Sequence, residues 1–275
     1  MRPILLFTLA SSLLAAPAPL GLVRAIISDT EGGAALPKSY DHAPGDTIFF
    51  SCRIAGYRQT EDEKVHLKYS VDVFDPAGAA LVEHIQNEIV EDVSPQDREW
   101  MPKIAEEVAI PPLISSGTYT IVIQAQDLIG KADTELKVPF QVRGRSVDPS
   151  DTLVTRNFRF LRSEDDERAL EKAAYRPGDT VWARFDITGF KYGPKNQIDV
   201  GYVVSILDGT GKVLWTQPDP TTEQSESFYP KRYISASLSI NIEKNTKPGT
   251  YAISVQMKDA VGTQTYETQQ TFSIE

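Results

Sequence analysis

Apolar and polar residues alternate along several segments of the chain, with the period of β-strands rather than of helices. The apolar positions of segment 47–55 share one phase, and they are Ile48, Phe50, Cys52 and Ile54. Turn sequences such as DPAG, DLIG and APGD separate these segments. In such turns Asp or Pro fixes the backbone and Gly accepts positive φ. The pattern predicts antiparallel strands joined by hairpins.

The alternating pattern occurs twice along the chain. The segment 43–57, APGDTIFFSCRIAGY, matches the segment 176–190, RPGDTVWARFDITGF. Further along the chain, the Gly-Thr-Tyr sequence that ends at Tyr119 matches the Gly-Thr-Tyr sequence that ends at Tyr251. The register slips by only one residue between these two matches, which indicates a duplicated domain. Large and small residues exchange places at one core pair: Phe50 and Cys52 become Ala183 and Phe185. A core that keeps its total volume tolerates that exchange.

The organisation predicted from the sequence is a signal peptide and two sandwiches. Residues 1–25 combine a basic Arg2, an apolar run and the small-residue site Val23-Arg24-Ala25, which is typical of a cleaved secretory signal. The first sandwich is placed at 26–143, a linker at 144–154 and the second sandwich at 155–275. The apolar run of about 13 residues is shorter than the roughly 20 that span a bilayer. We therefore expect an exported protein with no membrane span in its mature form, located in the periplasm, at the cell surface or outside the cell.

The net charge and the cysteine content restrict the classes of partner and the disulfides that we expect. The net charge is −10, and removal of residues 1–25, which contain two arginines and no acidic residue, would lower it to −12. Such a chain repels phosphate backbones, so nucleic acid is not expected as a partner. Cys52 is the only cysteine, so no disulfide can form within the chain. We interpret Cys52 as a small buried residue.

The second copy resembles a known family. YRPGDTVWARFDITGF (175–190), YVVSILDGTGKVL (202–214) and PGTYAISVQMKD (248–259) resemble the macroglobulin-type domain, an immunoglobulin-like sandwich found in thioester-containing macroglobulins and in bacterial surface proteins. Gly-Thr-Tyr before an alternating strand resembles the tyrosine corner of such sandwiches. The Cys-Gly-Glu-Gln thioester and the bait region are missing, so the resemblance implies the fold but not proteinase trapping. The predicted fold class is all-β, with two tandem antiparallel immunoglobulin-like sandwiches.

The sequence contains no catalytic pattern. Its three histidines lack zinc spacing, and CxxC, GxSxG and phosphate-binding loops are missing. We therefore expect neither enzymatic activity nor a cofactor or metal. Each Asp-containing turn supplies one carboxylate, and turn formation explains it better than calcium binding.

Two sets of residues are candidates for binding a partner. The segments 84–103 and 215–233 are interpreted as long variable inserts that a rigid sandwich would present, although a crossover between sheets needs no function. Their predicted binding residues are Trp100, Pro102, Lys103, Tyr229, Pro230 and Lys231. Phe49 and Trp182 occupy the same outward position in both copies. They are either anchors for a partner or aromatics covered by another part of the chain.

Three functions remain open at this point. The favoured one is a non-enzymatic protein that binds or spaces components at the cell surface, with an unidentified protein or glycan partner. The first alternative is a carbohydrate-recognition module that uses Trp182, Phe49 or Trp215. The second is an accessory or inhibitor domain of a secreted hydrolase with Asp186 and Asp199 as acid and base, although no spacing forces these two together.

Overall fold

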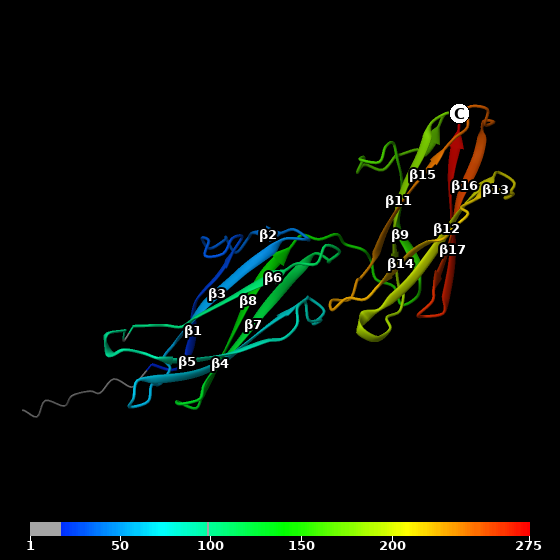
Figure 1. Ribbon diagram of the computed structural model, residues 1–275. Coiled ribbons are helices and arrows are strands. Elements are labelled where there is room, and N and C mark those ends of the chain that lie inside the picture. The colour runs from blue at the N-terminus through cyan, green and yellow to red at the C-terminus, as the bar shows by residue number, and fades with distance from the viewer. Residues whose placement is uncertain (1–17, 98) are drawn as a thin grey trace, which may run out of the picture.

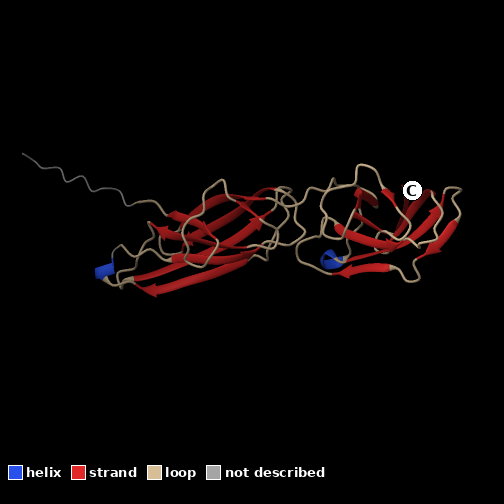
Figure 2. Cartoon of the chain, turned by 90° about the horizontal axis from the view of Figure 1, so that it is seen from above, coloured by secondary structure: helices blue, strands red, loops and turns tan. Residues whose placement is uncertain are grey.

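The structure is a computed structural model that describes residues 18–97 and 99–275. Its regular structure is almost entirely β-strand, which confirms the predicted all-β class. Figure 1 shows two bodies joined by one crossing of the chain, and Figure 2 shows the same two bodies end to end from above. No helix in the described part of the chain is long and apolar enough to cross a membrane. Most of the predicted signal peptide, residues 1–17, lies outside the described residues.

The first body is a sandwich of two sheets. One sheet has the order β1 (Gly21–Ser28), β3 (Thr47–Ala55) and β6 (Lys103–Ala109). The other has the order β2 (Asp41–His42), β8 (Ala132–Val142), β7 (Gly117–Asp127), β4 (Lys64–Phe74) and β5 (Ile85–Asp92). A short 3-10 helix, η1 (Pro95–Asp97), follows β5.

The second body repeats this arrangement. Its smaller sheet has the order β15 (Ile234–Asn241), β11 (Thr180–Thr188) and β9 (Val154–Leu161). Its larger sheet has the order β10 (Ala174–Tyr175), β17 (Gln264–Ile274), β16 (Gly249–Asp259), β12 (Ile198–Asp208) and β13 (Val213–Thr216), and β14 (Thr221–Ser225) also pairs with β12. A second 3-10 helix, η2 (Pro194–Asn196), precedes β12.

The two strand orders correspond one to one in the repeated parts. β3, β4, β7 and β8 of the first body have their counterparts in β11, β12, β16 and β17. In both bodies the short strand that follows the first loop pairs parallel to the last strand, as β2 with β8 and β10 with β17. The duplicated sequence therefore folds into two bodies of the same topology.

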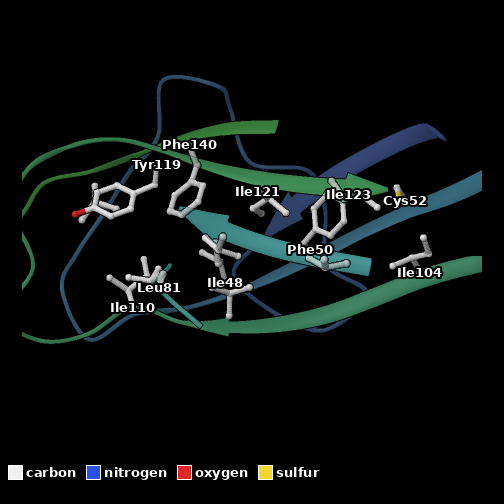
Figure 3. Close-up of a cluster of buried hydrophobic side chains, with 14 of the residues drawn as sticks. Ile48, Phe50, Cys52, Leu81, Ile104, Ile110, Tyr119, Ile121, Ile123 and Phe140 are labelled. Carbon is white, nitrogen blue, oxygen red and sulfur yellow. The ribbon is translucent and has the colours of Figure 1, made fainter. Parts of the chain in front are cut away.

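The alternating apolar side chains close the interior of each sandwich. Figure 3 shows Phe50 and Cys52 of β3 directed toward the same interior as Tyr119 and Phe140. Cys52 is 1% exposed, and burial raises the pKa of its thiol to about 12, so its interpretation as a small buried residue is confirmed. Phe185 takes the equivalent place in the second sandwich.

The tyrosine corner is present in both copies. The hydroxyl of Tyr119 donates a hydrogen bond of 2.9 Å to the carbonyl oxygen of Ser115. The hydroxyl of Tyr251 donates one of 2.8 Å to the carbonyl oxygen of Lys247. In each case the tyrosine ties the strand to the loop four residues before it, as the Gly-Thr-Tyr sequence indicates.

Two details differ from the sequence interpretation. The segments 84–103 and 215–233, interpreted as loops, contain the strands β5 and β14. Both are edge strands whose side chains are mostly exposed, so the burial that produces an alternating pattern is missing. Strand β1 begins at Gly21 and pairs with β3. Cleavage after Ala25 would therefore remove residues 21–25, the larger part of this strand of 8 residues.

Candidate functional site

The two sandwiches meet where the loop between β14 and β15 reaches the first sandwich (Figure 1). Tyr229 of this loop is 7% exposed and belongs to the apolar cluster of the first sandwich. Its hydroxyl donates a hydrogen bond of 2.9 Å to Oδ2 of Asp75. Nη2 of Arg232 donates one of 2.7 Å to the same oxygen, and its guanidinium lies 5.6 Å from the centre of the Tyr229 ring. A side chain of the second sandwich therefore completes the packing of the first.

Asp75 accepts hydrogen bonds from both sandwiches. Its Oδ1 accepts from the backbone N–H groups of Ala77 at 2.9 Å and Ala79 at 2.7 Å, while its Oδ2 faces the second sandwich. Burial by itself raises the pKa of Asp75, but hydrogen bonds from the Ala79 N–H and from the second sandwich outweigh burial and lower the pKa below its ordinary value. The ionised carboxylate is thus the form that this environment favours.

Two adjacent residues of the linker contact different sandwiches: Gly144 contacts the first and Arg145 the second. The hydroxyl of Ser116 donates a hydrogen bond of 2.5 Å to the carbonyl oxygen of Gly144. A Cβ at position 144 would lie 2.1 Å from the carbonyl oxygen of Ile114, so only glycine allows this approach. Nη2 of Arg145 lies 2.8 Å from Oδ2 of Asp186, a fully buried carboxylate of β11. We call this set of contacts the joint, and its residues are Asp75, Gly144, Arg145, Asp186, Tyr229 and Arg232.

The predicted binding residues of the first insert lie close to Tyr57, in the loop after β3. Trp100 is partly exposed, and its ring lies edge to face with Tyr57, with centroids 6.1 Å apart. Pro102 is buried and its carbonyl oxygen accepts from the N–H of Ile54 at 3.0 Å. Lys103 is exposed at the start of β6. Trp100 and Lys103 therefore remain accessible, whereas Pro102 serves strand pairing.

The predicted binding residues of the second insert lie at the joint. Tyr229 is covered by the first sandwich, so little of its ring is accessible to an outside partner. Pro230 and Lys231 are partly exposed, and the ammonium group of Lys231 forms an ion pair with Glu223 of β14. The structure does not bring the two predicted sets together, because Trp100 lies near Tyr57 and Tyr229 beside Asp75.

The outward aromatics face solvent only in part. Phe49 and Trp182 are both partly exposed, and each lines a shallow cavity. The cavity at Trp182 lies between the start of β11, the strand β10 and the C-terminal Glu275. The cavity at Trp182 has a volume of about 520 Å³ and that at Phe49 about 180 Å³. Trp215 is 47% exposed and lies on β13 of the other sheet. The cavity of the second copy is thus the larger of this pair.

The acid–base pair that the hydrolase alternative requires is not assembled. Asp186 lies on β11 of the smaller sheet, and Asp199 lies on β12 of the larger sheet. In the described part of the chain no cluster of His, Cys, Asp or Glu has the arrangement of a metal site. The turn carboxylate of Asp127 is held by N–H groups of its own turn and by that of Arg58 at 2.7 Å, so turn formation accounts for it.

Each larger sheet carries a shallow groove on its outer face. The groove of the second sandwich has a volume of about 610 Å³, and its lining includes Gly201 and Lys258. The groove of the first has about 480 Å³ and lies at the equivalent place, with Lys68 where Gly201 stands. Gln124 and Gln126 in the first groove already donate to carboxylates of β8. The two grooves follow from the duplication, and in the first of them these two amides are engaged within the sheet.

The residues of the joint could not be identified from the sequence. Asp75 reads as a turn former, and its counterpart Asp208 has the same turn, so turn chemistry explains both. Arg232 and Arg145 stand in polar segments with no periodic pattern. The one available signal was the aromatic Tyr229 in a polar insert, which indicated a contact but not its partner.

Comparisons with known proteins add little. No family model and no curated protein matches the chain. Among solved structures it is similar to a family 123 glycoside hydrolase from Clostridium perfringens. The match has 15% sequence identity and a TM-score of 0.29, and it covers 45% of this chain and 27% of the hydrolase chain. It is also similar to a structure named BspA_C_WT, with 10% identity, 91% of this chain, 99% of that chain and a TM-score of 0.30. Likenesses this weak assign neither an activity nor a partner.

Proposed function

We propose that the protein is an exported, non-enzymatic component of the periplasm or cell surface that binds or spaces other components through two sandwiches held at a fixed separation. The observation that carries this proposal is the joint. Two domains on a short linker move relative to one another unless their contact is well packed. Here the contact inserts Tyr229 into the first sandwich and pairs a buried carboxylate with a guanidinium.

The chemistry of the joint favours the docked arrangement. Separation of the two sandwiches would leave Asp75 without Arg232 and Tyr229, although its side chain is only 4% exposed in the docked form. Removing one partner of a buried ion pair is costly because the other charge is left uncompensated. A body with a fixed length can hold two partners, or one partner and an anchored end, at a constant distance.

Small-angle X-ray scattering tests the rigid arrangement. We expect the native chain to have one well-defined maximum dimension, and Tyr229→Ala to broaden the distance distribution while the strand content stays the same. An equally broad distribution for the native chain would overturn the spacer proposal.

The exposed loop of the first sandwich is the proposed contact with a partner. We expect Trp100→Ala to abolish capture of a purified partner and to leave the melting temperature nearly unchanged, since Trp100 is only partly buried. Trp215→Ala, which removes another exposed tryptophan on the second sandwich, is the matched control. Full capture by Trp100→Ala would exclude this loop as the contact.

A second candidate function, glycan recognition, is favoured by the cavity of about 520 Å³ that Trp182 lines. Aromatic rings bind the apolar faces of sugars, and a partly exposed tryptophan in a depression suits that contact. A glycan array tests it: binding should be lost in Trp182→Ala and kept in Phe49→Ala, the equivalent change in the first copy. An array with no signal would remove this candidate.

A further inference from the structure

The outer face of the smaller sheet in the second sandwich carries a concentration of arginines. Trp182, Arg184 and Asp186 project from β11 on this face, since they alternate with buried apolar residues. In the register of the sheet, Arg159 of β9 lies opposite Arg184, and Arg156 lies opposite Asp186. Residues directly opposite in an antiparallel pair have Cβ atoms roughly 4.5–5.5 Å apart, so these charged groups share one small area.

This area has more positive than negative charge. The buried Asp186 is already paired with Arg145 of the linker at 2.8 Å, and the side-chain amide of Asn157 donates to the same oxygen at 2.8 Å. Within residues 18–97 and 99–275, three arginines of this face form no ion pair, and they are Arg156, Arg159 and Arg184. Such a surplus of positive charge is unexpected in a chain with a net charge of −10.

Several of these groups also lack hydrogen-bond partners. The Nε atoms of Arg156 and Arg159 are buried and have no partner in the described structure, and the same holds for Oδ1 of Asp186. Burial, together with the positive charges of Arg145 and Arg184, outweighs the opposing negative charge of Asp186 and lowers the pKa of Arg159. Like charges directly opposite in a sheet destabilise it, and a buried donor without a partner costs free energy.

The fold does not require arginines at these positions. In the first sandwich the equivalent opposed pair is Ile26 and Ser51, in place of Arg159 and Arg184. Since the same strands form there without the charges, the arginines are a property of the second copy alone. Residues that cost stability and that the fold does not need are typical of binding sites.

We propose that this surface, the arginine face, binds an acidic glycan whose sugar rings carry carboxylate or sulfate groups. The inference deepens the glycan-recognition candidate above and rests on it. Guanidinium groups bind carboxylate and sulfate through two parallel N–H donors. Trp182 stands two residues before Arg184 on the same strand, roughly 6.6 Å away along β11. A sugar ring on the tryptophan would therefore place its acidic substituent beside the arginines.

The neighbouring charged groups agree with this assignment. The cavity at Trp182 is lined by two further arginines, Arg162 and Arg176, which are distinct from those of the arginine face. Of its acidic residues, Asp179 accepts a hydrogen bond from the backbone of its own turn, and Glu275 is paired with Lys172 outside the cavity lining. Two groups of the acidic segment 164–167 approach the arginines. The backbone carbonyl of Glu164 accepts a hydrogen bond from Arg184, and the negative charge of Glu167 raises the pKa of Arg159. Neither glutamate forms an ion pair with these arginines in the described residues.

The test replaces the arginines by the residues of the first copy. Arg159→Ile and Arg184→Ser are compared with the native chain by calorimetric titration with trigalacturonate at low salt, where exposed charges are least screened. Arg58→Ser is the matched control, because Arg58 is exposed in the loop after β3 of the first sandwich and its replacement removes the same charge outside the arginine face. We expect each of the two face variants to weaken binding at least tenfold and the control to change it less than twofold.

A stability measurement separates binding from a structural role. Without ligand, the two face variants should melt at the same temperature as the native chain or higher, because each removes a like-charge contact. A lower melting temperature for both variants, with unchanged binding, would show that the arginines serve the fold and would overturn the proposal. If Arg184→Ser fails to fold, Arg184→Lys keeps the charge without the paired donors and should still weaken binding.

The ligand panel separates this proposal from the candidate on which it rests. A neutral trisaccharide and poly-glutamate are titrated alongside trigalacturonate. If the neutral trisaccharide binds as tightly as trigalacturonate, and its binding is lost in Trp182→Ala but not in the arginine variants, glycan recognition is kept and the preference for acidic glycans is overturned. Tighter binding of poly-glutamate would assign the face to an acidic peptide instead. If the native chain binds none of the three ligands, both the acidic-glycan proposal and the glycan-recognition candidate are overturned.

Discussion

The two turns that end β4 and β12 have the same chemistry but different surroundings. In both, the aspartate accepts hydrogen bonds from the backbone of its own turn, Asp75 from Ala79 at 2.7 Å and Asp208 from Thr210 at 2.9 Å. Asp75 is buried and bonded to the second sandwich, whereas the hydrogen bonds of the Asp208 carboxylate in the described residues all come from its own turn. A residue selected by local turn geometry thus acquires an interdomain role in one copy only.

The outer faces of the two smaller sheets differ in the same way. Ile26 and Ser51 in the first copy correspond to Arg159 and Arg184 in the second. The inward positions are more alike, since they differ mainly by the exchange of Phe50 and Cys52 for Ala183 and Phe185. Packing constrains the interior of each copy to a similar volume, while the outer face is free to diverge and to take up a function.

The variants with the largest expected effect test whether Cys52 and Phe185 occupy equivalent core positions in the two sandwiches. Phe185 is fully buried and stacks on Phe158, with ring centroids 5.5 Å apart. We expect Phe185→Ala to lower the free energy of unfolding of the second sandwich by about 3–5 kcal/mol. Cys52→Ala at the same position of the first sandwich removes one sulfur atom and should cost about 1 kcal/mol. Urea denaturation checks both, and equal losses would contradict the proposed register.

The next effect concerns the two turn aspartates. Asp75→Asn keeps the turn acceptor but removes the charge opposite Arg232, so it should weaken the joint by roughly 1.5–3 kcal/mol. Calorimetry should then show separate transitions of the two sandwiches. Asp208→Asn is the matched change at the other turn and should leave the coupling intact. The same result for both variants would mean that turn formation alone was disturbed.

The joint should also depend on pH at the acidic end. Because the pKa of Asp75 is lowered in the folded state, its contribution is complete above its ordinary pKa of about 3.8 and is lost as the pH falls below that value. We expect the scattering profile to be constant from neutral pH down to about pH 4 and to broaden only below it. Broadening near pH 6 would contradict the assignment, since Asp75 remains ionised there.

The smallest effect concerns the start of β1. A chain that begins at Ile26 lacks the pairing of Gly21, Leu22 and Val23 with β3, and the partly buried Leu22 packs on the core. We expect it to be less stable than a chain that begins at Pro19, by about 1 kcal/mol or slightly more. Denaturation of both forms measures the difference. Equal midpoints would show that cleavage after Ala25 is compatible with the fold.

The repeat and its strands could be predicted because burial on one side of a sheet produces a period of two in the sequence. Strands such as β3 and β11 have that pattern, with every second residue buried. Strand β5 is exposed along most of its length, so its residues carry no such signal and the sequence predicts a loop there. The candidate site is predictable in part: the sequence indicates Trp100 and Trp182 as aromatics outside the core pattern, but it does not indicate that the arginines near Trp182 form a group.

The sequence by itself determined the all-β class, the duplication, the turns and the buried place of Cys52, because each is recorded in a period of two, in the repetition of that pattern, or in a four-residue turn. Only the tertiary structure decided that Tyr229 packs against Asp75, 154 positions earlier, and that Arg159 and Arg184 lie side by side. These pairings join residues far apart in the chain. Their positions are set by the packing of whole sheets and bodies, and no local pattern records them.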